Sequence, residues 1–253
     1  MTVIPKKELG QHFLVDENIL GVIARLAELD AADVVLEIGP GLGVLTRFLA
    51  ARVAHIHAVE LDETLEPRLR EIPRTTLHWG DAVTLDLSRL VPEPTKLVAN
   101  LPYNVATPIV VESLDRLPAI ASWCVMVQRE VADRFFAAPS TKAYGAVSVL
   151  VQLATERTGF HAVSREVFRP RPNVESALVA FRRTAPGIPT RTKRLVEGAF
   201  AHRRKMLANS LALAGVASRE QAASALETIG LEASARAEEL TPPQFVALAE
   251  ALA

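Results

Sequence analysis

The sequence predicts an α/β fold, in which a mixed, mostly parallel sheet of seven strands is followed by a small all-helical domain. Short apolar runs alternate with helical patterns from Val34 to Gln128, which is typical of a doubly wound sheet that binds ligands at the carboxyl ends of its strands. Every pattern after Pro189 is helical. The chain has 253 residues, of which 49% are apolar, and this suits one large domain and one small domain.

The expected elements follow each other in chain order. Strands are expected at residues 34–39, 55–60, 76–79, 96–100, 122–128, 158–163 and 177–183, with helices at 17–26, 44–52, 63–71, 108–116 and 147–154 and from 242 onward. The segment APGIP at residues 185–189 is the predicted linker. We therefore expect a first domain over residues 1–185 and a helical domain over residues 186–253.

Composition excludes several classes of protein. The sequence MTVIPKKELG at the start lacks the apolar region of a signal peptide, and no run of about 18 apolar residues occurs that could span a bilayer. The single cysteine, Cys124, lies in an apolar run and has no partner for an internal disulfide or a cysteine-rich metal site. We expect a cytoplasmic protein that does not engage a membrane.

The charge distribution favours a polyanionic partner, although the net charge of −1 at first argues against one. Between Arg157 and Lys205 the chain carries twelve lysines and arginines but three glutamates. A solvated charged face is the commoner fate of such residues. Their concentration in one stretch nevertheless favours contact with the phosphates of a nucleic acid.

A glycine-rich turn follows the first strand of the predicted sheet. The run from Glu37 to Gly43, EIGPGLG, comes after that strand and before a helix, so that Gly39 and Gly41 can form a tight turn and let a ligand approach the backbone amides. Glu60 ends the second strand, where its carboxylate can accept hydrogen bonds from ribose hydroxyls. This pair suits NAD as well as S-adenosylmethionine.

Two further groups of residues follow the third and fourth strands. Asp81 and Ala82 come after the third strand, and residues 100–103 (NLPY) come after the fourth. Each group alone could be a helix cap or a turn. Because all four strand ends meet at one edge of the sheet, the groups together frame one pocket. An NAD-dependent dehydrogenase, which is one alternative, would not need residues 100–103.

The joint arrangement resembles that of class I (Rossmann-like) methyltransferases, and NLPY resembles the motif of enzymes that methylate exocyclic amines of bases. More segments resemble the KsgA/RsmA family of small-subunit ribosomal RNA adenine dimethyltransferases: residues 7–14 (KELGQHFL), 125–131 (VMVQREV), 142–145 (KAYG), 168–176 (FRPRPNVES) and 200–211 (FAHRRKMLANSL). The resemblance covers residues 6 to beyond 211. His12 departs from the asparagine that many relatives carry, although either side chain could form a hydrogen bond to the cofactor.

The resemblance implies S-adenosylmethionine as the methyl donor, with no metal. Its binding residues would be Gln11, His12, Leu14, Gly39, Gly41, Glu60, Asp81, Ala82 and Asn100, with the glutamate on the ribose and Asp81 on the adenine. Because the sulfonium is already a potent electrophile, the protein has mainly to hold an adenine nitrogen in line with the methyl group.

The resemblance also implies the catalytic and RNA-binding residues. The Asn100 side-chain oxygen and the Leu101 carbonyl would accept hydrogen bonds from the target amine, and Pro102 would stiffen their loop. Tyr103 and Phe168 would stack on the flipped base, although Phe168 taken alone reads as an ordinary core residue. Candidate RNA contacts are Arg169, Arg171, Arg203, Arg204 and Lys205.

The function implied is N6,N6-dimethylation of two adjacent adenosines near the 3′ end of 16S rRNA in a small-subunit precursor, with a role in ribosome biogenesis. A monomer is expected. One alternative is a large-subunit adenine methyltransferase of the macrolide-resistance type, against which Leu101 and residues 142–145 argue. Another is an assembly factor whose RNA binding matters more than its catalysis.

Overall fold

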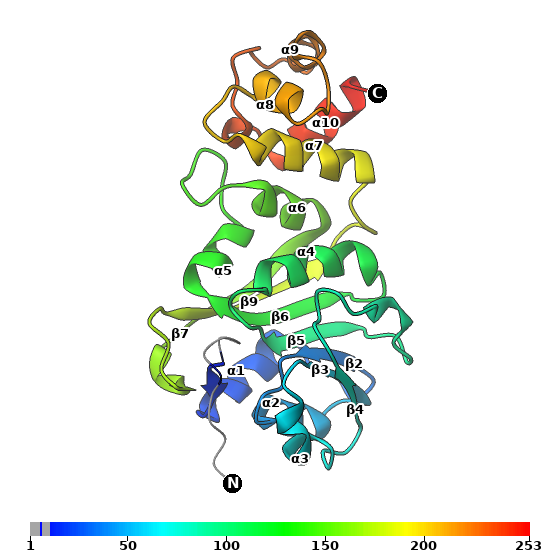
Figure 1. Cartoon of the computed structure of the whole chain (residues 1–253), viewed down its shortest axis with the longest axis vertical. Helices are drawn as coiled ribbons and strands as arrows, with labels where there is room; N and C mark the ends of the chain where they lie inside the picture. Colours follow the sequence, from blue (N-terminus) through cyan, green and yellow to red (C-terminus); the bar gives the residue numbers. More distant parts are fainter. Residues whose placement is uncertain (1–5, 7–10) are drawn as a thin grey trace. The chain divides into compact units, whose positions relative to one another are not determined.

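The computed structural model describes Lys6 and residues 11–253, so the first half of the segment 7–14 lies outside it (Figure 1). The strands are β1 Phe13–Leu14, β2 Val34–Ile38, β3 His55–Glu60, β4 Thr75–Trp79, β5 Lys96–Asn100, β6 Ser122–Gln128, β7 Thr155–Val163, β8 Phe168–Arg169 and β9 Ser176–Arg183. The helices are α1 Asn18–Leu26, α2 Val44–Ala50, α3 Glu66–Leu69, α4 Ala106–Arg116, α5 Arg129–Phe135, α6 Ala146–Ala154, α7 Thr190–Ala201, α8 Leu207–Leu213, α9 Arg219–Thr228 and α10 Pro242–Ala251.

The main sheet has seven strands in the order β4-β3-β2-β5-β6-β9-β7, which confirms the predicted mixed sheet. Strands β4, β3, β2, β5 and β6 pair in parallel, and β9 pairs with β6 in the antiparallel sense. The chain winds outward from β2 through β3 to β4 and, in the other direction, from β5 to β6. The carboxyl ends of β2 and β5 therefore form the switch point where such sheets bind ligands.

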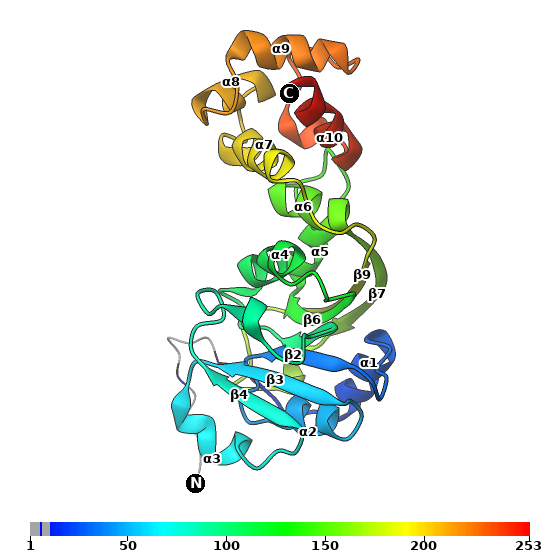
Figure 2. The ribbon, with the colours of Figure 1, turned by 90° about the vertical axis from the view of Figure 1, so that its right-hand side faces the viewer.

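Alternate side chains of the strands pack on opposite faces of the sheet. Val35, Val98 and Cys124 belong to a hydrophobic cluster with residues of α1, α2 and α3, whereas Leu36 and Leu97 face α4 across a small apolar hollow. Figures 1 and 2 show α1, α2 and α3 on one side of the sheet and α4 on the other. All five residues of β2 are buried, as expected of a strand covered on both faces.

A two-stranded ribbon of β1 and β8 was not predicted. It pairs Phe13 with Arg169 and Leu14 with Phe168 in the antiparallel sense. Two residues per strand are too few for a period-2 pattern to be visible in a sequence. The ribbon places the segment that begins at Gln11 beside the segment that begins at Phe168.

The chain forms two compact units, and their boundary differs from the predicted one. One unit holds residues up to 132 together with 156–183, and the other holds 133–155 and 184–253. The expected linker at residues 185–189 lies next to the observed boundary at residue 184. Residues 133–155, however, belong to the same unit as the C-terminal helices. One reason is Tyr144, which is fully buried, donates a hydrogen bond to the Leu240 carbonyl (2.7 Å) and packs against Phe200.

Within the part of the chain that the structure describes, no helix combines the length and the apolar character that crossing a membrane requires.

Candidate functional site

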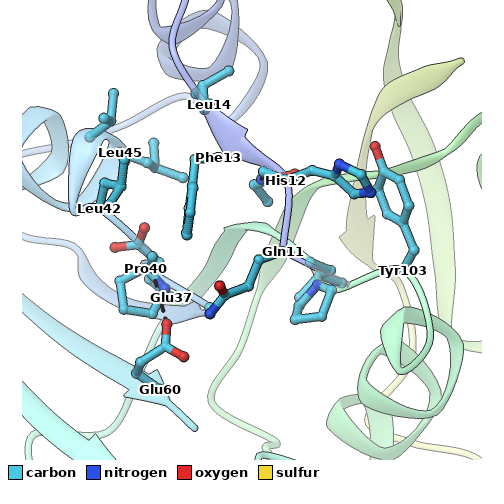
Figure 3. Close-up of a pocket in the computed structure, with 16 residues that line it drawn as sticks. Gln11, His12, Phe13, Leu14, Glu37, Pro40, Leu42, Leu45, Glu60 and Tyr103 are labelled. Atoms are coloured by element: carbon cyan, nitrogen blue, oxygen red, sulfur yellow. Dashed lines mark hydrogen bonds between the residues drawn. The ribbon is translucent and has the colours of Figure 1, made fainter. Parts of the chain in front are cut away.

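An open cavity lies at the carboxyl ends of β2, β3 and β5 in the first unit (Figure 3). Its volume is about 650 Å³ including the solvent-filled mouth, within the usual range for cofactor sites. The cavity is lined by Gln11, His12, Phe13, Leu14, Glu37, Gly39, Pro40, Gly41, Leu42, Val44, Leu45, Glu60, Asn100, Leu101, Pro102 and Tyr103. Sequence segments that lie up to about ninety residues apart thus meet in one place.

A second hollow of about 580 Å³ adjoins the first and shares Gly39, Glu60 and Pro102 with it. Asp81 and Ala82 line this second hollow. The structure therefore brings the nine predicted cofactor residues together around two hollows that share three lining residues.

The glycine-rich loop brings bare backbone to the cavity. Gly39 and Gly41 have positive φ angles of 74° and 55°, a region where side chains are disfavoured. A Cβ atom on Gly39 would lie 3.3 Å from the Pro102 ring, and one on Gly41 would lie 2.9 Å from the Phe13 ring. The amide of Gly39 already donates to the Val59 carbonyl (2.9 Å). Both the positive φ angles and the neighbouring Pro102 and Phe13 rings therefore require glycine at these two positions of the cavity lining.

Glu60 is held by three backbone amides at the end of β3. Its carboxylate accepts hydrogen bonds from the N–H groups of Gly41 (3.1 Å), Leu61 (2.9 Å) and Asp62 (2.9 Å). Burial raises the pKa of Glu60, and these hydrogen bonds only partly oppose the shift. A fixed, buried carboxylate of this kind suits a pair of ribose hydroxyls as hydrogen-bond donors.

Asn100 presents an unused acceptor at the end of β5. Its Nδ2 donates to the His12 carbonyl (3.2 Å), and because that oxygen can only accept, the orientation of the amide is fixed. Its Oδ1 is buried, and no described residue donates to it. A buried acceptor without a donor is costly, so an N–H group of a ligand is its natural partner.

Tyr103 is held by contacts that sequence analysis did not identify. Its hydroxyl is 2.6 Å from Oγ of Ser176, and its ring stacks on His12 with centroids 5.5 Å apart and an interplanar angle of 28°. Nδ1 of His12 lies 2.8 Å from the Pro170 carbonyl, which can only accept, so this nitrogen carries a proton. Burial raises the pKa of Tyr103, so its ring stays neutral. His12 thus packs against Tyr103 as well as lining the cavity.

Phe168 is not at the cavity. It is fully buried in the hydrophobic cluster, where β8 pairs it with Leu14, and it is absent from the lining of both hollows. This geometry matches the core interpretation of Phe168 and does not provide the second stacking face that the resemblance implied. The reason is that Phe168 packs in this cluster with Leu14, to which β8 pairs it, and the sequence pattern does not reveal this pairing.

Glu37 is a cavity residue whose chemistry sequence analysis missed. It is 1% exposed, and no described residue donates to its Oε2. Burial raises the pKa of Glu37 to about 8, and the Glu60 carboxylate adds to this shift while the Thr46 hydroxyl opposes it. An acidic residue inside an otherwise apolar buried strand was the available signal, since such a group rarely ionises without a partner.

Replacing Glu37 by glutamine should flatten the pH dependence of stability. Between pH 5 and pH 8 the folded chain keeps a proton on Glu37 that the unfolded chain releases, so the free energy of unfolding falls as pH rises, by up to about 1.4 kcal/mol per pH unit. Glutamine cannot titrate, and this component disappears. Urea denaturation of both proteins at pH 5 and pH 8 measures the effect, and an unchanged difference between the two pH values would contradict it.

Comparison with known proteins agrees with this geometry. The model of the ribosomal RNA adenine dimethylase family matches residues 5–253. Ribosomal RNA small subunit methyltransferase A of Rubrobacter xylanophilus is 47% identical over 96% of this chain and 94% of the relative, and that of Geobacter metallireducens is 41% identical over 98% and 95%.

Two solved structures have the same fold. A dimethyladenosine transferase from Plasmodium falciparum aligns with a TM-score of 0.80 at 21% identity and covers 94% of this chain and 96% of its own. The 23S rRNA methyltransferase ErmE aligns with a TM-score of 0.66 at 29% identity, with coverages of 95% and 99%. The matching family model, the relatives and the cavity lead to one conclusion: the chain belongs to the ribosomal RNA adenine dimethylase family.

Proposed function

We propose that this protein transfers methyl groups from S-adenosylmethionine to N6 of two adjacent adenosines near the 3′ end of 16S rRNA, in a precursor of the small ribosomal subunit. It is an rRNA adenine dimethyltransferase and acts in ribosome biogenesis. The observation that carries the proposal is the buried Oδ1 of Asn100, a fixed acceptor to which no described residue donates, in the lining of a cofactor-sized cavity.

The relatives favour the small subunit over the large one as the source of the substrate. Those named ribosomal RNA small subunit methyltransferase A reach 47% identity, whereas the 23S rRNA methyltransferase ErmE is 29% identical. Both share the fold, so the fold alone does not decide between them.

The residues around the two hollows fit S-adenosylmethionine. Gly39 and Gly41 line the cavity without side chains of their own, the Glu60 carboxylate can accept from ribose hydroxyls, and Asp81 lines the adjoining space where the adenine would lie. Gln11, His12 and Leu14 would cover the ligand, and Ala82 would line the adenine side. When bound, the cofactor supplies an electrophilic methyl group.

The protein's own contribution is to position the target amine. An adenine N6 donates its lone pair to the ring, so attack requires the nitrogen to become pyramidal. Hydrogen bonds from its N–H groups to Asn100 Oδ1 and to the Leu101 carbonyl would favour that geometry and would strengthen as positive charge develops on nitrogen. Pro102, packed over Gly39, restricts the loop that holds these acceptors.

Replacing Tyr103 by alanine should lower the rate of methyl transfer about 10- to 100-fold, because a stacked base is worth about 1 to 3 kcal/mol. Tyr103→Phe keeps the ring and removes only the hydroxyl that contacts Ser176. It should therefore retain most of the rate. Single-turnover kinetics on under-methylated small subunits distinguish the two variants. Equal losses in both would assign the effect to the hydroxyl and contradict stacking.

Arg169 and Arg171 are proposed to contact RNA phosphates from the first unit. Both are exposed. Nη1 of Arg169 donates to the carbonyls of Glu166 (3.1 Å) and Phe168 (2.9 Å), and Arg171 pairs with Glu166 (2.7 Å). These contacts limit the freedom of two cationic side chains near β8 without burying their charge.

The second unit is also proposed to contact RNA phosphates, through Arg203, Arg204 and Lys205. All three residues follow α7 and are exposed. Arg203 already binds Glu238 (3.2 Å) and the Lys142 carbonyl (3.0 Å). Its substitution would therefore disturb the unit as well as RNA binding, so Arg204 and Lys205 are the better positions for testing phosphate contacts by the salt dependence of affinity.

The test is to incubate the purified protein and S-adenosylmethionine with under-methylated small and large subunits separately, and then to map modified adenosines by mass spectrometry. Dimethyladenosine at two adjacent positions near the 3′ end of 16S rRNA is expected. Modification of large-subunit RNA would instead indicate an enzyme of the macrolide-resistance type. No modification, together with tight binding of the subunit, would indicate an assembly factor.

A further inference from the structure

Asp62 is a buried carboxylate that the proposed chemistry does not use. It follows β3 by two residues and is 3% exposed. Its Oδ1 accepts hydrogen bonds from the backbone N–H (3.2 Å) and the hydroxyl (2.6 Å) of Thr64 and forms an ion pair with Nζ of Lys6 (2.7 Å). Its Oδ2 accepts from Nε2 of Gln11 (3.0 Å). Lys6 and Gln11 lie more than fifty positions earlier in the chain.

Lys6, Gln11 and Asp62 form a closed ring of hydrogen bonds. The backbone N–H of Lys6 donates to Oε1 of Gln11 (2.8 Å), and because an N–H can only donate, Nε2 of Gln11 must face Asp62. Burial alone would raise the pKa of Asp62, but the hydrogen bonds from Lys6, Thr64 and Gln11 outweigh burial and lower the pKa to about 2. Asp62 therefore stays ionised and keeps its cationic partner throughout the physiological pH range.

This ring of hydrogen bonds connects to both Glu60 and Asn100, the residues proposed to bind the cofactor and the target amine. The backbone N–H of Asp62 donates to Oε1 of Glu60 (2.9 Å), the carboxylate proposed to hold the ribose. On the other side, Gln11 leads directly into His12, whose carbonyl accepts from Nδ2 of Asn100 (3.2 Å). A segment fastened at Asp62 is therefore in place both to cover the cofactor and to orient Asn100.

We infer that Asp62 is a positioning residue of the cofactor site: by binding Lys6 and Gln11 it fastens residues 11–14 over the cavity and so strengthens the binding of S-adenosylmethionine. The inference rests on the proposed function only for the identity of the cofactor. The clasp itself, defined as Lys6, Gln11 and Asp62, is a property of the chain without ligand.

The chain offers a substitution that breaks the clasp and keeps the local fold. In Asp62→Asn the remaining oxygen can still accept from Thr64, since asparagine caps as well as aspartate. The new amide nitrogen would face Nε2 of Gln11, donor against donor, and the charge that holds Lys6 is lost. Lys6→Met removes the positive charge and keeps most of the length of the side chain. Because this side chain is 39% exposed, the substitution should not disturb folding.

Thr64→Val is the matched control. It removes the 2.6 Å hydroxyl contact to the same oxygen of Asp62 but touches neither Lys6 nor Gln11. If Asp62 served only to cap the turn after β3, Asp62→Asn would behave like the wild type, and Thr64→Val would show the same or a larger effect.

The experiment combines amide hydrogen exchange of a peptide covering residues 11–14 in the ligand-free full chain with the Kd of S-adenosylmethionine and of S-adenosylhomocysteine by calorimetry. We expect exchange to rise at least fivefold in Asp62→Asn and Lys6→Met, and Kd to rise about tenfold and threefold respectively, with Thr64→Val within twofold of the wild type. Unchanged exchange in the first two variants, or equal effects in Thr64→Val, would overturn the clasp. A wild-type chain that binds neither ligand would contradict the proposed function, and the exchange rates would still decide on the clasp.

Discussion

Asn100→Ala is expected to lower the rate of methyl transfer by about 10²- to 10³-fold or more, the loss typical of removing one preorganised hydrogen-bond partner of a transition state. The Kd of S-adenosylmethionine should change by less than several-fold. The reason is that Oδ1 of Asn100 has no donor among the described residues and would gain one only when the target amine is bound. Single-turnover transfer to under-methylated small subunits, together with calorimetric binding of the cofactor, measures the two quantities.

The matched control for this variant is Asn18→Ala, the same truncation at an exposed asparagine of α1 outside the cavity lining. Its rate should equal that of the wild type. Thermal unfolding of both variants separates a catalytic loss from a folding defect, because Asn100→Ala also removes the bond from Nδ2 to the His12 carbonyl. An Asn100→Ala protein that keeps more than a tenth of the wild-type rate would exclude the proposed role.

The sheet was predictable because its signals are local. Strands β3 and β6 begin and end at the predicted residues, His55–Glu60 and Ser122–Gln128, since apolar runs of that length between turn residues have few alternatives. The ribbon of β1 and β8 and the short helix α5 were missed. The ribbon depends on pairing between residues more than 150 positions apart. Two residues per strand are too few to show a periodicity that would predict this pairing.

The sequence predicts those residues of the candidate site whose positions follow from the order of the strands in the sheet. Asn100 and Glu60 could be brought together in advance because parallel strands end at one edge of the sheet. What surrounds them could not be predicted in this way. The contact of Ser176 with Tyr103 and that of Asp62 with Gln11 each join segments that are far apart in the chain, and a sequence pattern does not specify such contacts.

Glu60→Ala is expected to weaken the binding of S-adenosylmethionine by about 10²-fold or more, because a hydrogen bond to a charged acceptor contributes about 1.5 to 3 kcal/mol and two ribose hydroxyls would lose theirs. The substitution also frees the amides of Gly41, Leu61 and Asp62, which loosens the glycine-rich loop. Calorimetry with S-adenosylmethionine measures the loss. The affinity for small-subunit RNA, measured in parallel, should change far less, and equal losses for both ligands would indicate misfolding.

The pH dependence of binding makes the prediction for Glu60 more specific. Because burial raises the pKa of Glu60, its carboxylate takes up a proton at a higher pH than an exposed glutamate does. The ribose hydroxyls require the ionised form as acceptor, so the affinity should fall as pH is lowered through this raised pKa and stay level above it. Glu60→Gln should bind more weakly and lack this inflection, since a glutamine does not titrate. If the wild type and Glu60→Gln show the same inflection, another group controls the binding of the cofactor, and the ribose contact assigned to Glu60 is wrong.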